Sequence, residues 1–496
     1  MKRIQVQAIP VVLILLVGSV LGAQEKPTPP SGASVDNPSE WKKFQQSCGS
    51  LEFHTAGDCV DLLFTGQPVH IAIGSLPPQD GFGAGVAVVG FLKPTETWRP
   101  SWNADAVATD NASWRTGVYF KLVHTPLLKT TVHYGKPKYK SNLTDLPEYT
   151  VFNLYAQAIS LNKLTFFGLG PLSAEAGRSY YGMLEVIAGT NVIKPLSMRW
   201  NVALLGELNG RFVELRPSTG NSSPSIGMLY TDATAPGLTD QPAFLQLGEG
   251  IRARPAFWND RFQLDYNLSY QQFVPPGDTY YSFQRVNIDL SNNVAIYHLT
   301  TRFYHPRDSN GPDECSIDRI GGQPSCSLDK RAQIANCKET KERDDSNCKA
   351  ISRDLRGSVG FRLFFSTSVT QGSDQVPFYF QPTLGGGDLN GNPTLSSYQD
   401  YRFRAPNVLL LRESFEHLIW GPLGIALMVD EGKVALTRGE FGASPWLRSY
   451  SAGMTLRAGG FPQVFLLFSW GGSEGTHTIA NVNPSLLGGS TRPSLF

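Results

Sequence analysis

Long segments in which apolar and polar residues alternate constrain the fold of this chain more than any other feature. The clearest examples are residues 198–205, 262–271, 358–365 and 449–457. Successive side chains of a β-strand point to opposite faces, so each segment predicts a strand with one apolar and one polar face. Many segments exceed the ~5–6 residues of an ordinary globular strand. No long segment with the period of a helix follows the N-terminal region. The pattern therefore predicts an all-β protein.

The first 23 residues have the order of a cleaved secretory signal peptide. Lys2 and Arg3 precede an apolar run from Ala8 to Leu21, and the small residue Ala23 precedes a polar stretch. The run is short for a spanning helix, which needs about 20 apolar residues. No later segment is apolar for long enough to span a bilayer as a helix. We therefore expect residues 1–23 to be a signal peptide and the chain to be exported.

An exported all-β chain with long strands fits a closed antiparallel transmembrane β-barrel in the bacterial outer membrane, and a soluble β-sandwich is the alternative. Trp420, Trp446 and Trp470 lie at segment ends, where aromatic residues favour the bilayer interface. In hydrocarbon every backbone polar group must be paired, and a closed sheet has no edge. Since bacterial barrels have even strand counts, we expect about 16 strands within residues 81–496. Outer-membrane lipid and lipopolysaccharide are the expected surroundings.

Residues 24–80 form the expected periplasmic leader, which is Pro-rich and contains a cysteine pair. The barrel that follows has two special segments, a charged Cys-rich insertion at 305–352 and a loop at 384–404. Segments 280–290 and 294–304 are each read as a strand, with one long strand as the alternative.

Several function classes are disfavoured by composition and motifs. A net charge of +1 gives no reason to expect nucleic acid as a partner. Residues 471–475 match the Gly-x-Ser-x-Gly nucleophile motif, but that motif needs a strand-to-helix turn and here joins two β segments. Asp388 begins a calcium-loop-like sequence that has Pro393 at the required glycine position. We expect no enzyme activity, no cofactor and no metal.

Three motifs resemble those of the BamA/TamA-type outer-membrane assembly and translocation superfamily, also called the bacterial surface antigen family. The loop 384–404 reads Leu-Gly-Gly-Gly, then Leu-Ser-Ser-Tyr, then Tyr-Arg-Phe-Arg; residues 429–434 resemble the Phe-x-Asp-x-Gly-x-Val strand; and residues 166–170 read Phe-Phe-Gly-Leu-Gly. The resemblance implies a barrel of 16 strands whose extracellular loop folds back into the lumen. Its site residues would be Gly385, Gly386, Tyr398, Arg402, Arg404 and Asp430.

The resemblance also implies that an arginine from the loop faces Asp430. The usual Arg-Gly of the loop is replaced by Ser396-Ser397, and the Glu-x-Arg of the next strand by Ser414-Phe415-Glu416. Arg402 or Arg404 would then be the partner of Asp430. The alternative is that Asp430 is a solvated residue of the lumen wall.

Two functions remain open at this stage. Family members that handle proteins carry periplasmic POTRA domains, and residues 24–80 are too short and Pro-rich for one. The first hypothesis is outer-membrane protein assembly or translocation with separate periplasmic or outer-membrane protein partners. The alternative is a passive channel or structural barrel without insertase activity.

Six cysteines in an exported chain indicate disulfide bonds. They are Cys48, Cys59, Cys315, Cys326, Cys337 and Cys348. Cys48 and Cys59 are the natural local pair, while the pairing of the other four stays open. Long loops of such barrels usually lie outside the cell, but counting strands back from the C-terminus places 305–352 in the periplasm, and we favour the periplasm.

Overall fold

The computed structural model describes residues 69–482 and 494–495, except residues 78, 81, 96, 126–148, 198–199, 219–223, 259, 278–279, 305–347, 389–392, 459–460, 473 and 475. The expected signal peptide, most of the leader and most of the insertion lie outside these residues. So do all the cysteines except Cys348, which begins a strand and whose side chain is not described. The disulfide bonds therefore stay a prediction.

Among the described residues, one antiparallel sheet of seventeen strands contains almost all of the secondary structure, and since its strand β9 has only two residues, sixteen longer strands remain. The all-β class and the strand count are thus confirmed. The strands of this sheet are β1 (Val69–Ser75), β2 (Phe82–Phe91), β3 (Trp98–Thr109), β4 (Trp114–His124), β5 (Thr150–Phe166), β6 (Ser179–Ser197), β7 (Val202–Pro217), β8 (Phe244–Ala253), β9 (Ala256–Phe257), β10 (Phe262–Val274), β11 (Phe283–Tyr304), β12 (Cys348–Thr370), β15 (Asn407–Trp420), β16 (Leu423–Ala435), β17 (Leu447–Ala458), β18 (Phe461–Trp470) and β19 (Thr476–Val482). None of the helices in the described ranges is both long and apolar enough to cross a membrane.

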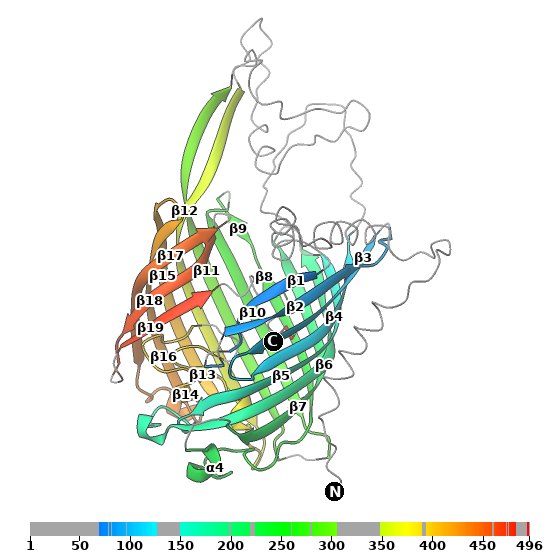
Figure 1. Ribbon diagram of the computed structural model, residues 1–496, viewed down its shortest axis with the longest axis vertical. Helices are drawn as coiled ribbons and strands as arrows, with labels where there is room; N and C mark the ends of the chain where they lie inside the picture. The colour runs from blue at the N-terminus through cyan, green and yellow to red at the C-terminus, as the bar shows by residue number, and fades with distance from the viewer. Residues whose placement is uncertain are drawn as a thin grey trace, which may run out of the picture.

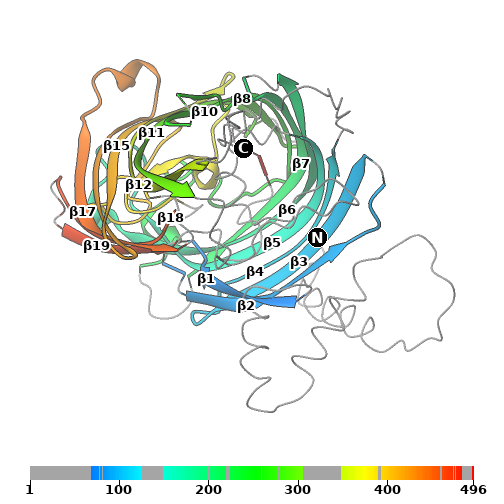
Figure 2. The ribbon, with the colours of Figure 1, turned by 90° about the horizontal axis from the view of Figure 1, so that it is seen from above.

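Each long strand pairs with the next one along the chain, and the wall curves into a barrel shape (Figures 1 and 2). At the two ends of this series, β1 pairs with β2 and β19 pairs with β18. No ladder between β1 and β19 is present among the described residues. Closure of the barrel is therefore still a prediction.

The structure corrects three strand boundaries. The strand β1 lies within the residues that we assigned to the leader, so the sheet begins before residue 81. Residues 283–304 form the single long strand β11, which was the alternative reading. The strand β12 begins at Cys348, so residues 348–352 belong to the wall and not to the insertion that we assigned to 305–352.

The two faces of the wall have opposite character, as β7 shows. Leu208 and Phe212 are 43% and 54% exposed, whereas Glu207, Asn209 and Arg211 between and beside them are 6%, 1% and 5% exposed. A soluble sandwich would bury the apolar row and expose the charged one. This inverted alternation is the pattern of a wall with lipid outside and a polar lumen inside.

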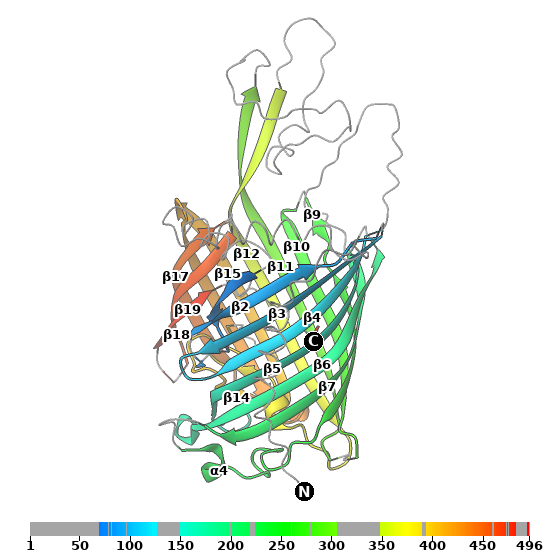
Figure 3. The same cartoon turned by 45° about the vertical axis from the view of Figure 1, so that its right-hand side comes forward.

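The connections fall at two ends of the barrel because antiparallel strands alternate in direction. The sixteen-strand order places the start of β1, the end of β19 and the β11–β12 connection at one end. The strands β11 and β12 project beyond the rest of the wall there (Figures 1 and 3). The insertion thus emerges at the same end as both termini of the wall, as the strand count required. Its side of the membrane stays a prediction.

The opposite end is packed with aromatic and aliphatic side chains. The largest cluster joins Phe166 and Tyr181 of β5 and β6 to Phe378 and Tyr401 of the β12–β15 connection. Ile226 of the short helix α4 (Ile226–Leu229) completes it. This cluster holds the loop of interest against the wall.

Candidate functional site

The candidate site is the β12–β15 connection, which contains the loop 384–404. Its two ends pair with each other as the short strands β13 (Thr383–Leu384) and β14 (Phe403–Arg404). Between them Gly385 has a φ of +112°, and a Cβ added there would lie 2.6 Å from the Cβ of Arg402. A Cβ on Gly386 would lie 2.7 Å from the backbone nitrogen of Asp400. Both glycines are thus required by the close approach of the two halves of the loop.

The loop packs on the inner side of β15, β16 and β17. Leu384, Leu395 and Tyr398 are buried with Val434 and Leu447 of the wall. The Ser397 amide donates a hydrogen bond of 2.8 Å to Ser449 Oγ on β17. The described part of the loop is therefore held by the wall through apolar and polar contacts together.

Asp430 has an arginine partner, but the prediction of Arg402 or Arg404 is wrong. The partner is Arg412, which stands directly opposite Asp430 in the β15–β16 ladder. Its Nε lies 2.6 Å from Asp430 Oδ1 and its Nη2 lies 3.0 Å from Oδ2. The same Nη2 donates to the carbonyl oxygen of Pro393 at 2.6 Å. Arg412 thus fastens the loop to the wall, and Asp430 is not a solvated residue.

Arg402 holds the loop to two other connections. Its guanidinium lies 2.6 Å from Glu474 Oε1, in the β18–β19 connection. It also donates to Ser173 Oγ at 2.8 Å and to the Ser173 carbonyl oxygen at 2.7 Å, in the β5–β6 connection. The rings of Phe167 and Phe403 lie against it, with centroids 5.0 Å and 4.6 Å away.

Arg404 is fully buried and joins the loop to the Phe166–Gly170 motif. It donates to the Phe378 carbonyl oxygen at 2.7 Å and to the Tyr181 hydroxyl at 3.3 Å. The Gly170 amide donates to the carbonyl oxygen of Arg404 at 2.8 Å. Two motifs that the sequence separates by more than 200 residues are therefore in direct contact.

Tyr398 lies under the β18–β19 connection. A Cβ on Gly472, which has a φ of +70°, would lie 2.0 Å from the Tyr398 hydroxyl oxygen. Burial raises the pKa of Tyr398 and raises the pKa of Tyr401 further, so both hydroxyls stay protonated near neutral pH. Residues 471–475 lie between the strands β18 and β19, whereas a nucleophile elbow needs a strand followed by a helix.

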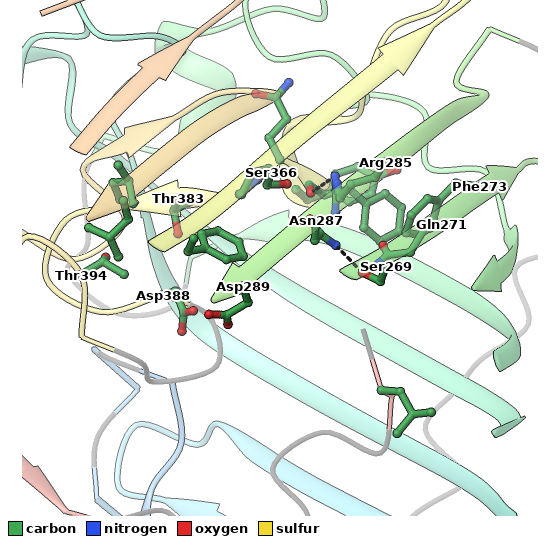
Figure 4. A pocket seen from close by; sticks show the side chains of 18 of the residues that line it. Ser269, Gln271, Phe273, Arg285, Asn287, Asp289, Ser366, Thr383, Asp388 and Thr394 are labelled. Carbon is green, nitrogen blue, oxygen red and sulfur yellow. Dashed lines mark hydrogen bonds between the residues drawn. The ribbon is translucent and has the colours of Figure 1, made fainter. Parts of the chain in front are cut away.

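A polar cavity of about 330 Å³ lies between the loop and the lumen faces of β6, β7, β10, β11 and β12 (Figure 4). Two ion pairs lie in it, Arg211 with Glu185 at 3.0 Å and Arg362 with Asp289 at 2.7 Å. Arg285 donates to the Phe380 carbonyl oxygen at 2.6 Å. Such a lining suits water and polar chain segments. Within the described part of the chain, no group of His, Cys, Asp and Glu side chains is arranged to hold a metal ion.

Comparison with known proteins gives a fold likeness only. No protein-family model matches the chain, and no curated protein matches it. Among solved structures, BamA from Haemophilus ducreyi lacking POTRA domains 1–3 is similar, with 10% identity, a TM-score of 0.43, and coverage of 83% of this chain and 66% of that one. CdiB from Escherichia coli has 12% identity and a TM-score of 0.44, covering 83% and 62%. CdiB from Acinetobacter baumannii has 10% identity and a TM-score of 0.42, covering 83% and 59%. The chain spans less than two thirds of the length of each.

Proposed function

We propose that this chain is a β-barrel of the bacterial outer membrane, of the BamA/TamA type, that takes part in protein assembly or translocation together with separate partner proteins. The exposed apolar row and the buried polar row of β7 support the membrane location. The loop 384–404 contacts Arg412, which is the partner of Asp430, and also contacts the Phe166–Gly170 motif, and both contacts support the type.

The observation that carries the role in handling proteins is the seam between β1 and β19. Among the described residues, β1 pairs with β2 and β19 pairs with β18, so each of these strands has one paired side. An unpaired backbone group in hydrocarbon costs several kcal/mol, so the two edges must find partners. The edge of a sheet offers its backbone N–H and C=O groups to an added strand, so the seam is where an extended segment of a client can pair with the wall.

Site-specific photocrosslinking in growing cells tests this proposal. A photoreactive residue at Ile71 of β1 or Thr478 of β19 is expected to capture newly exported β-barrel proteins, identified by mass spectrometry. The matched control is Leu204 on the outer face of β7, which is 40% exposed and far from the seam. Equal capture at all three positions, or capture at none, would reject a client site at the seam.

The polar cavity favours the second candidate, a passive channel. Single-channel conductance of the purified barrel distinguishes the two. Steady conductance that is independent of clients, combined with no capture at the seam, would establish the channel.

A further inference from the structure

The described C-terminal residues lie inside the barrel, far from the strand that precedes them. Strand β19 ends at Val482, yet Ser494 and Leu495 lie against the lumen face of β7, on another part of the wall (Figures 1 and 2). Leu495 also contributes to the lining of the polar cavity. The wall of the barrel therefore also contacts residues that follow its last strand.

Two charged side chains of β7 hold this segment. Glu207 Oε2 accepts a hydrogen bond of 2.8 Å from the Leu495 amide. Arg211 Nη2 donates to Ser494 Oγ at 3.2 Å. Both side chains project from the buried, inward row of β7 and are 6% and 5% exposed as residues. One contact is made to the backbone of the segment and the other to a small hydroxyl.

The rest of the network fixes these two groups in place. Glu207 Oε1 accepts hydrogen bonds from Asn209 Nδ2 at 2.7 Å and from the Tyr155 hydroxyl. Arg211 is paired with Glu185 at 3.0 Å and donates from Nε to Gln246 Oε1 at 2.5 Å. Because other partners hold the remaining atoms, one carboxylate oxygen and one guanidinium nitrogen are directed at the segment. A preorganised acceptor for a backbone amide is what a polypeptide site needs.

We infer that the lumen face of β7 is a binding site for an extended polypeptide segment, and that the chain's own C-terminal residues are its resident ligand. Residues 483–496 contain no acidic residue and one arginine, which suits a site with a buried glutamate. While the segment is bound, it occupies lumen space next to the polar cavity. Any other chain that uses this face must displace it.

Binding of a synthetic peptide to the purified barrel tests the inference without clients or partner proteins, so its outcome is independent of the proposed function. The probe is a peptide of residues 484–496 with a fluorophore at its N-terminus. It is expected to bind a barrel that lacks residues 484–496 and not the full chain, whose site is filled. The full chain carrying Leu495→Pro lacks the amide donor to Glu207 and is expected to bind the probe more strongly than the full chain and more weakly than the shortened barrel.

The peptide itself supplies the matched controls. A Leu495→Pro peptide is expected to bind about tenfold more weakly, the effect of one hydrogen bond to a charged group. A Leu495→Ala peptide keeps the amide and is expected to lose much less. Equal binding of the Pro and Ala peptides, or no binding of the original peptide to the barrel that lacks residues 484–496, would overturn the inference.

Discussion

Arg412 and Asp430 face each other across the β15–β16 ladder, and the guanidinium that pairs with Asp430 also donates a hydrogen bond to the Pro393 carbonyl oxygen of the loop. The side chains are 12% and 1% exposed. This ion pair therefore stabilises both the wall and the position of the loop, and its loss should destabilise both.

The first prediction concerns this pair. Arg412→Ala leaves a buried carboxylate without its partner, and we expect a loss of about 3–5 kcal/mol in the free energy of unfolding. The double variant Arg412→Met, Asp430→Leu removes both charges and should lose less. Urea unfolding followed by tryptophan fluorescence measures both. In Arg412→Ala the loop should also become open to trypsin at Arg402 and Arg404, and unchanged digestion would contradict the fastening role.

The second prediction concerns Gly472, which lies over Tyr398. Gly472→Ala adds both backbone strain and a clash with the Tyr398 hydroxyl, whereas Gly421→Ala adds strain alone, since Gly421 has a φ of +52° and open space around its Cβ position. We expect Gly421→Ala to lower the unfolding free energy by about 1 kcal/mol and Gly472→Ala by an additional ~1–3 kcal/mol. Equal losses would mean that Tyr398 does not pack against this turn.

A third prediction tests the lipid face. Leu208, which is 43% exposed on the outside of β7, should not tolerate a charge, and Leu208→Arg should lower stability in lipid by about 2–4 kcal/mol. Leu172, which is 88% exposed in the β5–β6 connection, serves as the control, because Leu172→Arg leaves the charge in water. Refolding titrations in vesicles give both values. Equal effects would be incompatible with a membrane-facing β7.

The fourth prediction is a pH dependence that originates at Asp80, in the β1–β2 connection. Burial raises the pKa of its carboxyl group, although Ser113 Oγ and two backbone amides donate to it. A raised pKa in the folded state means that the stabilisation is complete below the ordinary carboxyl pKa and is lost as pH rises through the folded value. Unfolding free energy should therefore fall from about pH 4 upward. Asp80→Asn should lack this component, and an identical pH profile for the variant would refute the assignment.

The fifth prediction concerns the cysteines, of which Cys48 and Cys59 are the expected local pair. We expect all six to be oxidised, since the chain is predicted to be exported. Removing Cys48 should leave the barrel folded, with heat-modifiable mobility on gels, because the bond closes a short loop that precedes the sheet. Mass spectrometry without reduction is the measurement, and six free thiols would contradict the prediction.

The strand pattern was readable from sequence because alternation depends only on local chemistry. The partner of Asp430 could not be predicted from the sequence, because the register of β15 and β16 shifts. Counting back from the turn that joins Trp420 to Leu423 pairs Asp430 with Glu413, but an irregularity between Leu418 and Trp420 moves Arg412 into that position. A single extra residue in a strand changes every later pairing, and nothing in the sequence marks where it falls.

Two other features also depend on long-range packing. The strand β1 has only seven residues and follows a Pro-rich segment, so its alternation was too short to separate from the leader. The position of Ser494 and Leu495 on β7 depends on contacts between residues nearly 300 apart. The glycines and arginines of the loop were identified correctly as loop residues, whereas the groups that they contact were not.

The loop connects two parts of the wall that lie far apart along the chain. Arg402 donates hydrogen bonds to Ser173, between β5 and β6, and forms an ion pair with Glu474, between β18 and β19. It therefore joins an early part of the wall to its last hairpin. These contacts of Arg402 lie at one end of the barrel only. If the edges of β1 and β19 separate, the end of the wall that Arg402 holds stays together. The gap between the two strands then widens toward the opposite end and does not run along the whole length of the wall.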